Sequence, residues 1–216
     1  FFAYEMAQKH PNKRILLIER GNRVEDRKCP ETVLGKCVKC KPFCNITNGF
    51  SGAGAFSDGK LSLYNKEDDD FYVGGNLHKY IGVEATKRLI DYTDSVYLEF
   101  GATTKKEGTE HQAEVAKIRK RAENVGVELI NIPIRHLGTD EAHGIYLRIE
   151  HYLENVESIT LEFNAEVTDL LIDGNKINGV IYQSQGKTKT ANADKVVIAV
   201  GRVGANWLLN MCSTHE

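Results

Sequence analysis

The sequence predicts an α/β protein with an inserted antiparallel segment. Two runs, at residues 15–18 and 196–200, are apolar without alternation, which is typical of parallel strands buried on both faces. Stretches with helical periodicity precede and separate these runs. Between residues 165 and 192, short strand-like runs alternate with glycine-containing turns, a pattern that indicates antiparallel hairpins.

The composition fits a globular chain and excludes some partners. The chain has 216 residues, and 41% of them are hydrophobic, which is enough for a core. Its 28 basic and 30 acidic residues are spread along the sequence, so no basic stripe is available for nucleic acid. The apolar runs are too short to span a bilayer. We expect a cytoplasmic protein with no nucleic-acid partner and no membrane span, and the sequence does not set the oligomeric state.

The remaining elements follow from periodicity and from turn residues. A first helix is expected over residues 1–8, because Pro11 disfavours helical geometry at the residue before it. Residues 22–80 show little periodicity and are expected to form a long ordered loop with a function of its own. Further helices are expected over residues 83–100, 109–125, 139–155 and 205–211, and further strands over 127–135, 158–163, 166–172, 177–183, 188–192 and 195–200.

Glu19 follows the first apolar strand directly. Dinucleotide-binding folds place a carboxylate at the carboxyl end of such a strand, where it accepts hydrogen bonds from the adenosine ribose. A solvated charge at the end of a strand would give the same pattern. The last apolar run ends at Gly201, and a glycine there lets the backbone approach a bound cofactor, although an ordinary turn is the alternative.

With these segments the chain resembles the largely uncharacterised bacterial FAD-dependent dehydrogenases, within the broader NAD(P)/FAD-dependent oxidoreductases. The resemblance is carried by residues 15–21, 29–40, 52–61 and the final strand with Gly201 and Arg202. Of these, residues 52–61 are specific to that group. The resemblance implies a Rossmann-like FAD-binding fold and FAD as cofactor. It also implies transfer of electrons or hydride through the flavin to an unknown small-molecule substrate, with NAD(P)H as a candidate electron donor.

The same resemblance implies a division into domains. Residues 1–80 and 160–216 would form a partial FAD-binding domain, and residues 81–159 an inserted helical or α+β segment. The family begins with a strand and a G-x-G-x-x-G loop that binds the pyrophosphate, whereas this sequence starts after that motif. The family's first strand would lie between the strands at 15–18 and 196–200. We therefore expect a fragment of a longer protein, inactive alone and retaining little or no FAD.

The resemblance also implies positions for the cofactor. Glu19 would bind the adenosine ribose with Arg20 beside it, and Val167 would meet the adenine through its backbone. Ala199 and Gly201 would pass close to the dinucleotide. The segment that lines the cofactor near its middle or flavin end contributes Gly52, Gly54, Ser57, Asp58, Gly59 and Lys60. Within this segment, Asp58 and Lys60 are the polar groups to test first for chemistry, although a plain turn role also explains Asp58. No catalytic residue is identified.

Four of the five cysteines are crowded between Cys29 and Cys44, in the spacing C-x7-C-x2-C-x3-C. The central pair, Cys37 and Cys40, matches the spacing of zinc or iron–sulfur ligands. Neighbouring lysines instead favour reactive thiols, and structural or incidental cysteines are the third alternative. The sequence does not decide among them, and we assign no metal ligand. A second functional hypothesis is therefore a non-catalytic nucleotide-fold remnant with a cysteine-ligated metal-binding or structural loop.

Overall fold

The computed structural model describes residues 1–64, 73–130 and 132–215, and within them the chain is a mixed α/β protein with three small sheets. Its helices are α1 (Phe2–Lys9), α2 (Glu31–Leu34), α3 (His78–Ile81), α4 (Val83–Glu99), α5 (Gln112–Glu123), α6 (Thr139–Glu154) and α7 (Ala205–Thr214). Its strands are β1 (Ile15–Ile18), β2 (Lys60–Ser62), β3 (Ile134–His136), β4 (Ile159–Glu162), β5 (Ala165–Asp173), β6 (Lys176–Ser184) and β7 (Lys187–Asn192). Two short 3₁₀ helices cover Val24–Asp26 and Gly52–Phe56.

Contacts between residues divide the chain into two compact units. The first unit comprises residues 1–53 and 146–216, and the second comprises residues 54–145. The domain boundaries expected from the sequence, near residues 80 and 160, stay a prediction. None of the helices in the described ranges is long and apolar enough to cross a membrane.

A parallel pair of strands forms the part of the first unit that matters most for function. β1 pairs with β4 in a register that runs from Ile15 opposite Ile159 to Ile18 opposite Glu162. The ladder continues one step further, because the backbone N–H of Glu19 donates to the carbonyl of Glu162 at 2.9 Å. Glu19 therefore lies at the carboxyl end of a parallel strand, as the sequence predicts.

The core of the first unit packs α1 and α6 with these strands. Ile149 and Leu153 are buried four residues apart on one face of α6. The rings of Tyr4 and Tyr152 meet with centroids 5.4 Å apart, which joins α1 to the same helix. The buried apolar residues of this unit are Ala3, Tyr4, Val24, Ile149, Leu153, Ile159, Ala165, Leu170 and Tyr182.

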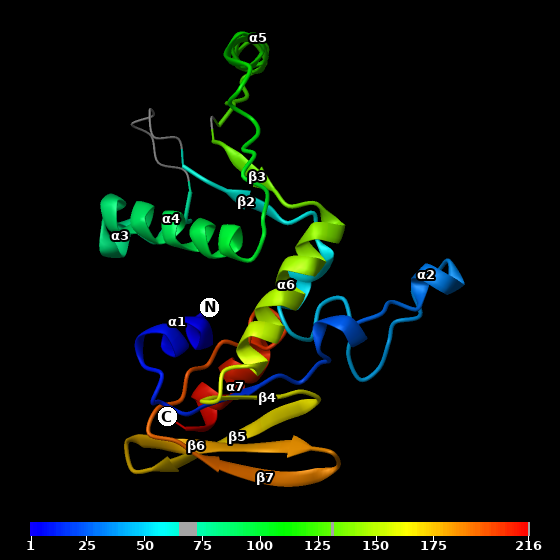
Figure 1. Cartoon of the computed structure of the whole chain (residues 1–216), viewed down its shortest axis with the longest axis vertical. Coiled ribbons are helices and arrows are strands. Elements are labelled where there is room, and N and C mark those ends of the chain that lie inside the picture. The colour runs from blue at the N-terminus through cyan, green and yellow to red at the C-terminus, as the bar shows by residue number, and fades with distance from the viewer. Residues whose placement is uncertain (65–72, 131, 216) are drawn as a thin grey trace. The chain divides into compact units, whose positions relative to one another are not determined.

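An antiparallel meander completes the first unit, and its strands are the gold and orange arrows of Figure 1. β6 lies between β5 and β7 in the sheet order β5-β6-β7. The connection from β5 to β6 has only two residues, beginning with Gly174, which suits a tight hairpin. A shift in register between Val167 and Asp169 bends β5 close to its start. The expected strands at 166–172, 177–183 and 188–192 are thus confirmed.

The second unit is organised around a buried ion pair. β2 and β3 form a two-stranded antiparallel sheet in which Leu61 lies opposite Arg135. The guanidinium of Arg135 reaches Asp94 on α4 through two hydrogen bonds, from Nε at 2.6 Å and from Nη2 at 2.7 Å. It also donates to the carbonyl oxygens of Thr103 at 2.6 Å and Lys105 at 3.3 Å. Arg135 is only 2% exposed, so this pair belongs to the core of the unit.

One expected strand is wrong, and another is shorter than expected. The segment 195–200 forms no strand in the described part of the chain, and Val197, Ile198 and Val200 are 37–54% exposed. A strand needs the hydrogen bonds of a neighbour, and the described residues supply no such neighbour for this segment. Of the strand expected over 127–135, only its last two positions lie in a strand, β3, among the described residues, and position 131 lies outside them. The helices expected over 83–100, 109–125, 139–155 and 205–211 are confirmed with small shifts at their ends.

Candidate functional site

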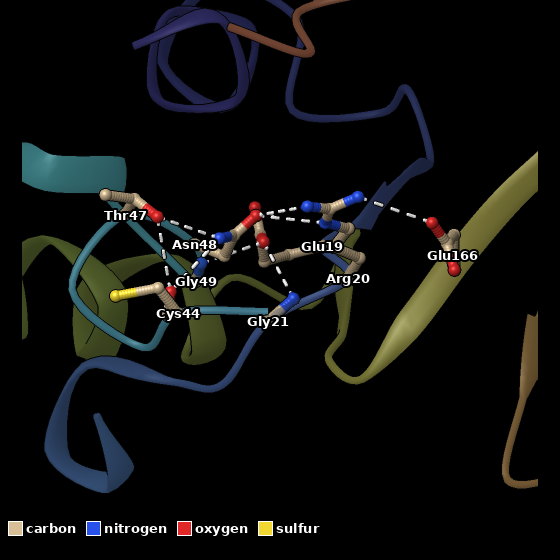
Figure 2. A network of polar contacts seen from close by, with 8 residues as sticks. All are labelled: Glu19, Arg20, Gly21, Cys44, Thr47, Asn48, Gly49 and Glu166. Carbon is tan, nitrogen blue, oxygen red and sulfur yellow. Dashed lines mark hydrogen bonds and ion pairs between the residues drawn. The ribbon is translucent and has the colours of Figure 1, made fainter. Parts of the chain in front are cut away.

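Within the described part of the chain, only one of the two carboxylate oxygens of Glu19 accepts hydrogen bonds. Its Oε1 atom accepts hydrogen bonds from the backbone N–H groups of Gly21 at 2.8 Å and Gly49 at 3.0 Å. Figure 2 shows both bonds, which fix the orientation of the side chain. Among the described residues, Oε2 has no hydrogen-bond partner. A fixed carboxylate with one uncommitted oxygen can accept a hydrogen bond from a ligand hydroxyl.

The chain after β1 lies directly against the loop that carries Gly49. A Cβ atom at Gly21 would fall 2.3 Å from the backbone nitrogen of Gly49, a distance that no side chain tolerates. Glycine at position 21 is therefore required for the approach that brings the N–H of Gly49 to Glu19.

Arg27 holds that loop in place from within. Its side chain is 2% exposed and its guanidinium donates to four backbone carbonyl oxygens at 2.5–2.9 Å, those of Asn45, Ile46, Phe50 and Gly52. Burial lowers the pKa of the guanidinium, and the negative charge of Glu19 opposes that shift. Because the four carbonyls come from both ends of the loop, the guanidinium of Arg27 holds the two ends of residues 45–52 together.

Arg20 is held beside Glu19 by a buried amide. Oδ1 of Asn48 accepts hydrogen bonds from Nε of Arg20 at 2.9 Å and from Nη2 at 2.7 Å. Asn48 is 7% exposed, and its Nδ2 donates to the carbonyl of Cys44 and to Oγ1 of Thr47, each at 3.0 Å. On its other side, Nη1 of Arg20 contacts Glu166 at 3.4 Å (Figure 2). In the part of the chain that the structure describes, N–H groups on both terminal nitrogens of Arg20 stay uncommitted.

A polar groove of about 580 Å³ opens next to Arg20. Its charged lining residues are Arg20, Lys41 and Glu166, and five further lining residues carry amide side chains. Phe43 supplies an aromatic ring, with the guanidinium carbon of Arg20 5.7 Å from the ring centroid. Amides both donate and accept hydrogen bonds, so this wall can bind the polar edge of a heterocycle or a sugar.

The cysteine cluster forms no ligand set. All five cysteines are free thiols, and no three His, Cys, Asp or Glu side chains in the described ranges are grouped as metal ligands. Cys44 stands apart because the backbone N–H of Ile46, followed by the N–H and hydroxyl of Thr47 and the charge of Arg27, lowers the pKa of its thiol. Partial burial of Cys44 opposes this shift. The hypothesis of a cysteine-ligated metal loop gains no support from this arrangement.

The residues expected along the cofactor fall into separate groups. Gly52 belongs to the first unit, and its carbonyl is one of the four that bind Arg27. The others belong to the second unit: Gly54, Ser57, Asp58, Gly59 and Lys60.

Local bonds hold this second group. Ser57 Oγ donates to the carbonyl of Gly54 and accepts from the N–H of Gly59, each at 3.1 Å. Asp58 and Lys60 form an exposed ion pair at 2.9 Å. Gly59 packs against Leu137, where a Cβ atom would meet the leucine at 2.9 Å. A cofactor-binding role for these residues stays a prediction.

The other expected contacts lie in the first unit. Val167 is in β5, opposite Tyr182 and next to Glu166 of the groove. Ala199 is exposed in the segment without strand structure, and Gly201 begins the turn that leads to α7. Roles for Val167, Ala199 and Gly201 at a cofactor also stay predictions.

Sequence reasoning missed Asn48 and Arg27, which organise the site. Asn48 and Gly49 form an Asn-Gly pair, which signals a turn but not a partner for a side chain. Asn48 lies 28 residues from Arg20 in the sequence. Arg27 carries no local signal at all, because its partners are backbone carbonyls whose positions only the folded loop defines.

The comparisons with known proteins give a distant structural likeness. No family model matches the chain, and no curated protein matches it. Among solved structures, the chain is similar to L-amino acid deaminase from Proteus vulgaris, with 11% sequence identity and a TM-score of 0.40. The match covers 86% of this chain and 41% of the deaminase, so the chain spans well under half the length of that protein.

Proposed function

We propose that this chain is the adenosine-binding part of an FAD-dependent oxidoreductase. One observation carries the proposal. At the carboxyl end of a parallel strand, Glu19 keeps one carboxylate oxygen uncommitted, and the adjacent Arg20, which lines the groove, keeps N–H groups uncommitted. This is the position at which doubly wound folds bind the ribose of a dinucleotide.

The donor and acceptor inventory fits an adenosine ribose. Oε2 of Glu19 can accept from a ribose hydroxyl, while Oε1 stays bound to the two glycine N–H groups that orient it. A phosphate on that hydroxyl would bring a second negative charge against Glu19, so the pair favours an unphosphorylated ribose. The groove wall, with its amides and Phe43, offers hydrogen bonds and an aromatic face to a base.

FAD would supply the chemistry, because its isoalloxazine ring carries electrons or hydride. The residues of this chain would bind and orient the adenosine end. Glu19 would hold the ribose and Arg20 would donate to the nucleotide. The oxidised substrate and the electron donor are set by parts of the site that these residues do not form.

The test is a titration of the isotope-labelled chain with ADP, followed through the backbone amide signals of Gly21 and Gly49. ADP is the probe because the proposed contacts lie at the adenosine end. Both amides bond Oε1 of Glu19, so a ligand on Oε2 should shift them in a saturable way. Glu19→Gln removes the charged acceptor and should weaken binding by about tenfold or more, as expected for a hydrogen bond to a charged group.

Glu162→Gln is the matched control. Glu162 ends the neighbouring strand β4, but its oxygens are already occupied by Tyr182 at 2.9 Å and Lys189 at 2.6 Å. Glu162→Gln should leave ADP affinity unchanged. Equal losses in the two variants, or no saturable shift in the wild-type chain, would contradict the proposal.

A further inference from the structure

We propose that Asn48 is a positioning residue that determines the nucleotide affinity of this site by fixing the guanidinium of Arg20. The inference rests on the proposed function, since it concerns the same adenosine site. Asn48 does not line the groove, and it would act on the ligand only through Arg20.

The amide of Asn48 is fully committed, in contrast to the guanidinium that it holds. Its Oδ1 accepts two hydrogen bonds from Arg20, and its Nδ2 donates to Cys44 and Thr47 (Figure 2). Asn48 is 7% exposed, so these bonds are shielded from water. It therefore links the turn at 44–48 rigidly to one edge of the guanidinium.

Three groups restrict Arg20 and leave one direction open. Asn48 binds the edge formed by Nε and Nη2, Phe43 lies at 5.7 Å from the guanidinium carbon, and Glu166 contacts Nη1 at 3.4 Å. The side chain of Glu166 is 61% exposed, and its contact with Arg20 is long. Because water competes for an exposed contact, this ion pair contributes little. Of these three, only Asn48 is both buried and doubly bonded to Arg20.

Fixing Arg20 matters because a free arginine loses much rotational freedom when a ligand orders it. A guanidinium that is already held toward the groove loses little, and its uncommitted N–H groups are pre-positioned as donors. The expected consequence is a tighter complex without any contact between Asn48 and the nucleotide.

A double-mutant cycle with ADP as the probe tests the inference. Asn48→Ala should weaken binding by about threefold to tenfold, through the returned freedom of Arg20. Arg20→Met should weaken binding by about tenfold or more. In the Arg20→Met background, Asn48→Ala should have no further effect, because the residue through which it acts is gone. An equal loss in both backgrounds would mean that Asn48 only supports the fold, and would overturn the inference.

A second readout needs no nucleotide. The Nε–H proton of Arg20 should give a resolved, slowly exchanging signal in the wild-type chain, since it donates to a buried oxygen. Asn48→Ser, which keeps a turn-forming residue but cannot reach Arg20, should abolish that protection and serves if the alanine variant does not fold. Glu162→Gln, which lies outside the groove lining and contacts Tyr182 and Lys189, is the control and should leave both the signal and ADP affinity unchanged. A wild-type signal that exchanges as fast as a free arginine would overturn the inference.

The outcomes separate the two proposals. No ADP-dependent shift in the wild-type chain would overturn the proposed function, and this inference with it. Saturable ADP binding that does not respond to Asn48 would overturn only the inference.

Discussion

Arg135 of the second unit and Arg20 of the first differ in how many of their N–H groups are hydrogen-bonded within the protein. Arg135 is 2% exposed and binds both oxygens of Asp94 as well as two backbone carbonyls. Arg20 is one-third exposed on its side chain and retains N–H groups that no described residue accepts. An arginine whose hydrogen bonds are all made within the protein stabilises the fold. An arginine that is held in place but retains free N–H groups can donate to a ligand.

The two carboxylates at the ends of β1 and β4 repeat this contrast. Glu162 accepts from Tyr182 and Lys189 with both oxygens, and so is closed by its own chain. Glu19 commits one oxygen to backbone N–H groups and keeps the other open. Glu19 and Arg20 are adjacent in sequence, and within the described residues each retains polar atoms without a partner.

Arg135→Met should have the largest effect on stability. The substitution leaves the carboxylate of Asp94 without its partner in the core, which costs about 3–5 kcal/mol for a buried pair. The measurement is the free energy of unfolding in urea. Lys60→Met, which breaks the exposed pair with Asp58, is the control and should cost less than about 1 kcal/mol. Similar losses in the two variants would show that Arg135 is not a core residue.

Glu162 should make stability depend on pH. The hydrogen bond from Lys189, followed by those from Ser184 and Tyr182, lowers the pKa of this carboxyl below its usual value of 4.5. A lowered pKa stabilises the fold above the unfolded value, and this contribution is lost as pH falls through the folded value. The difference in unfolding free energy between wild type and Glu162→Gln should therefore shrink between about pH 6 and pH 3. A difference that is constant with pH would contradict this account.

Arg20→Met should change stability less than Arg135→Met. The contact of Arg20 with Glu166 is exposed and contributes little, so the main loss is the two hydrogen bonds to the buried Oδ1 of Asn48, about 1–3 kcal/mol in urea unfolding. Its effect should fall on ADP binding. A loss as large as that of Arg135→Met would show that Arg20, like Arg135, serves to stabilise the fold and would argue against a role in ligand binding.

The thiol of Cys44 should be more reactive than an ordinary cysteine thiol at the same pH. Because the N–H groups of Ile46 and Thr47 lower the pKa of its thiol, its reaction with iodoacetamide should reach half-maximal rate at a lower pH than free N-acetylcysteine. Mass spectrometry of the peptide that contains Cys44 gives the rate at each pH. A midpoint at or above that of the free thiol would contradict the predicted environment of the turn at 44–48.

The sequence predicted the elements whose signals are local. The strand at residues 15–18, the acidic residue after it and the hairpins from 165 to 192 follow from periodicity, side-chain type and turn residues. The segment 195–200 has the composition of a strand, yet composition does not supply a hydrogen-bonding neighbour, and the segment lies exposed.

The site itself could be predicted only in part. Glu19 was predicted from its place after a strand and Arg20 from the family resemblance, and a role for either at a cofactor stays a prediction. Asn48, Gly49 and Arg27 were not predicted, because they act across a loop without periodicity and through backbone groups. Such contacts depend on a loop conformation that no local pattern specifies.

The most direct test of the central claim is a structure of the chain in complex with ADP. We predict a ribose hydroxyl within about 3.2 Å of Oε2 of Glu19, with Oε1 still bound to Gly21 and Gly49, and the open nitrogens of Arg20 facing the nucleotide. ADP bound at another place, with Oε2 of Glu19 still without a partner, would contradict the account.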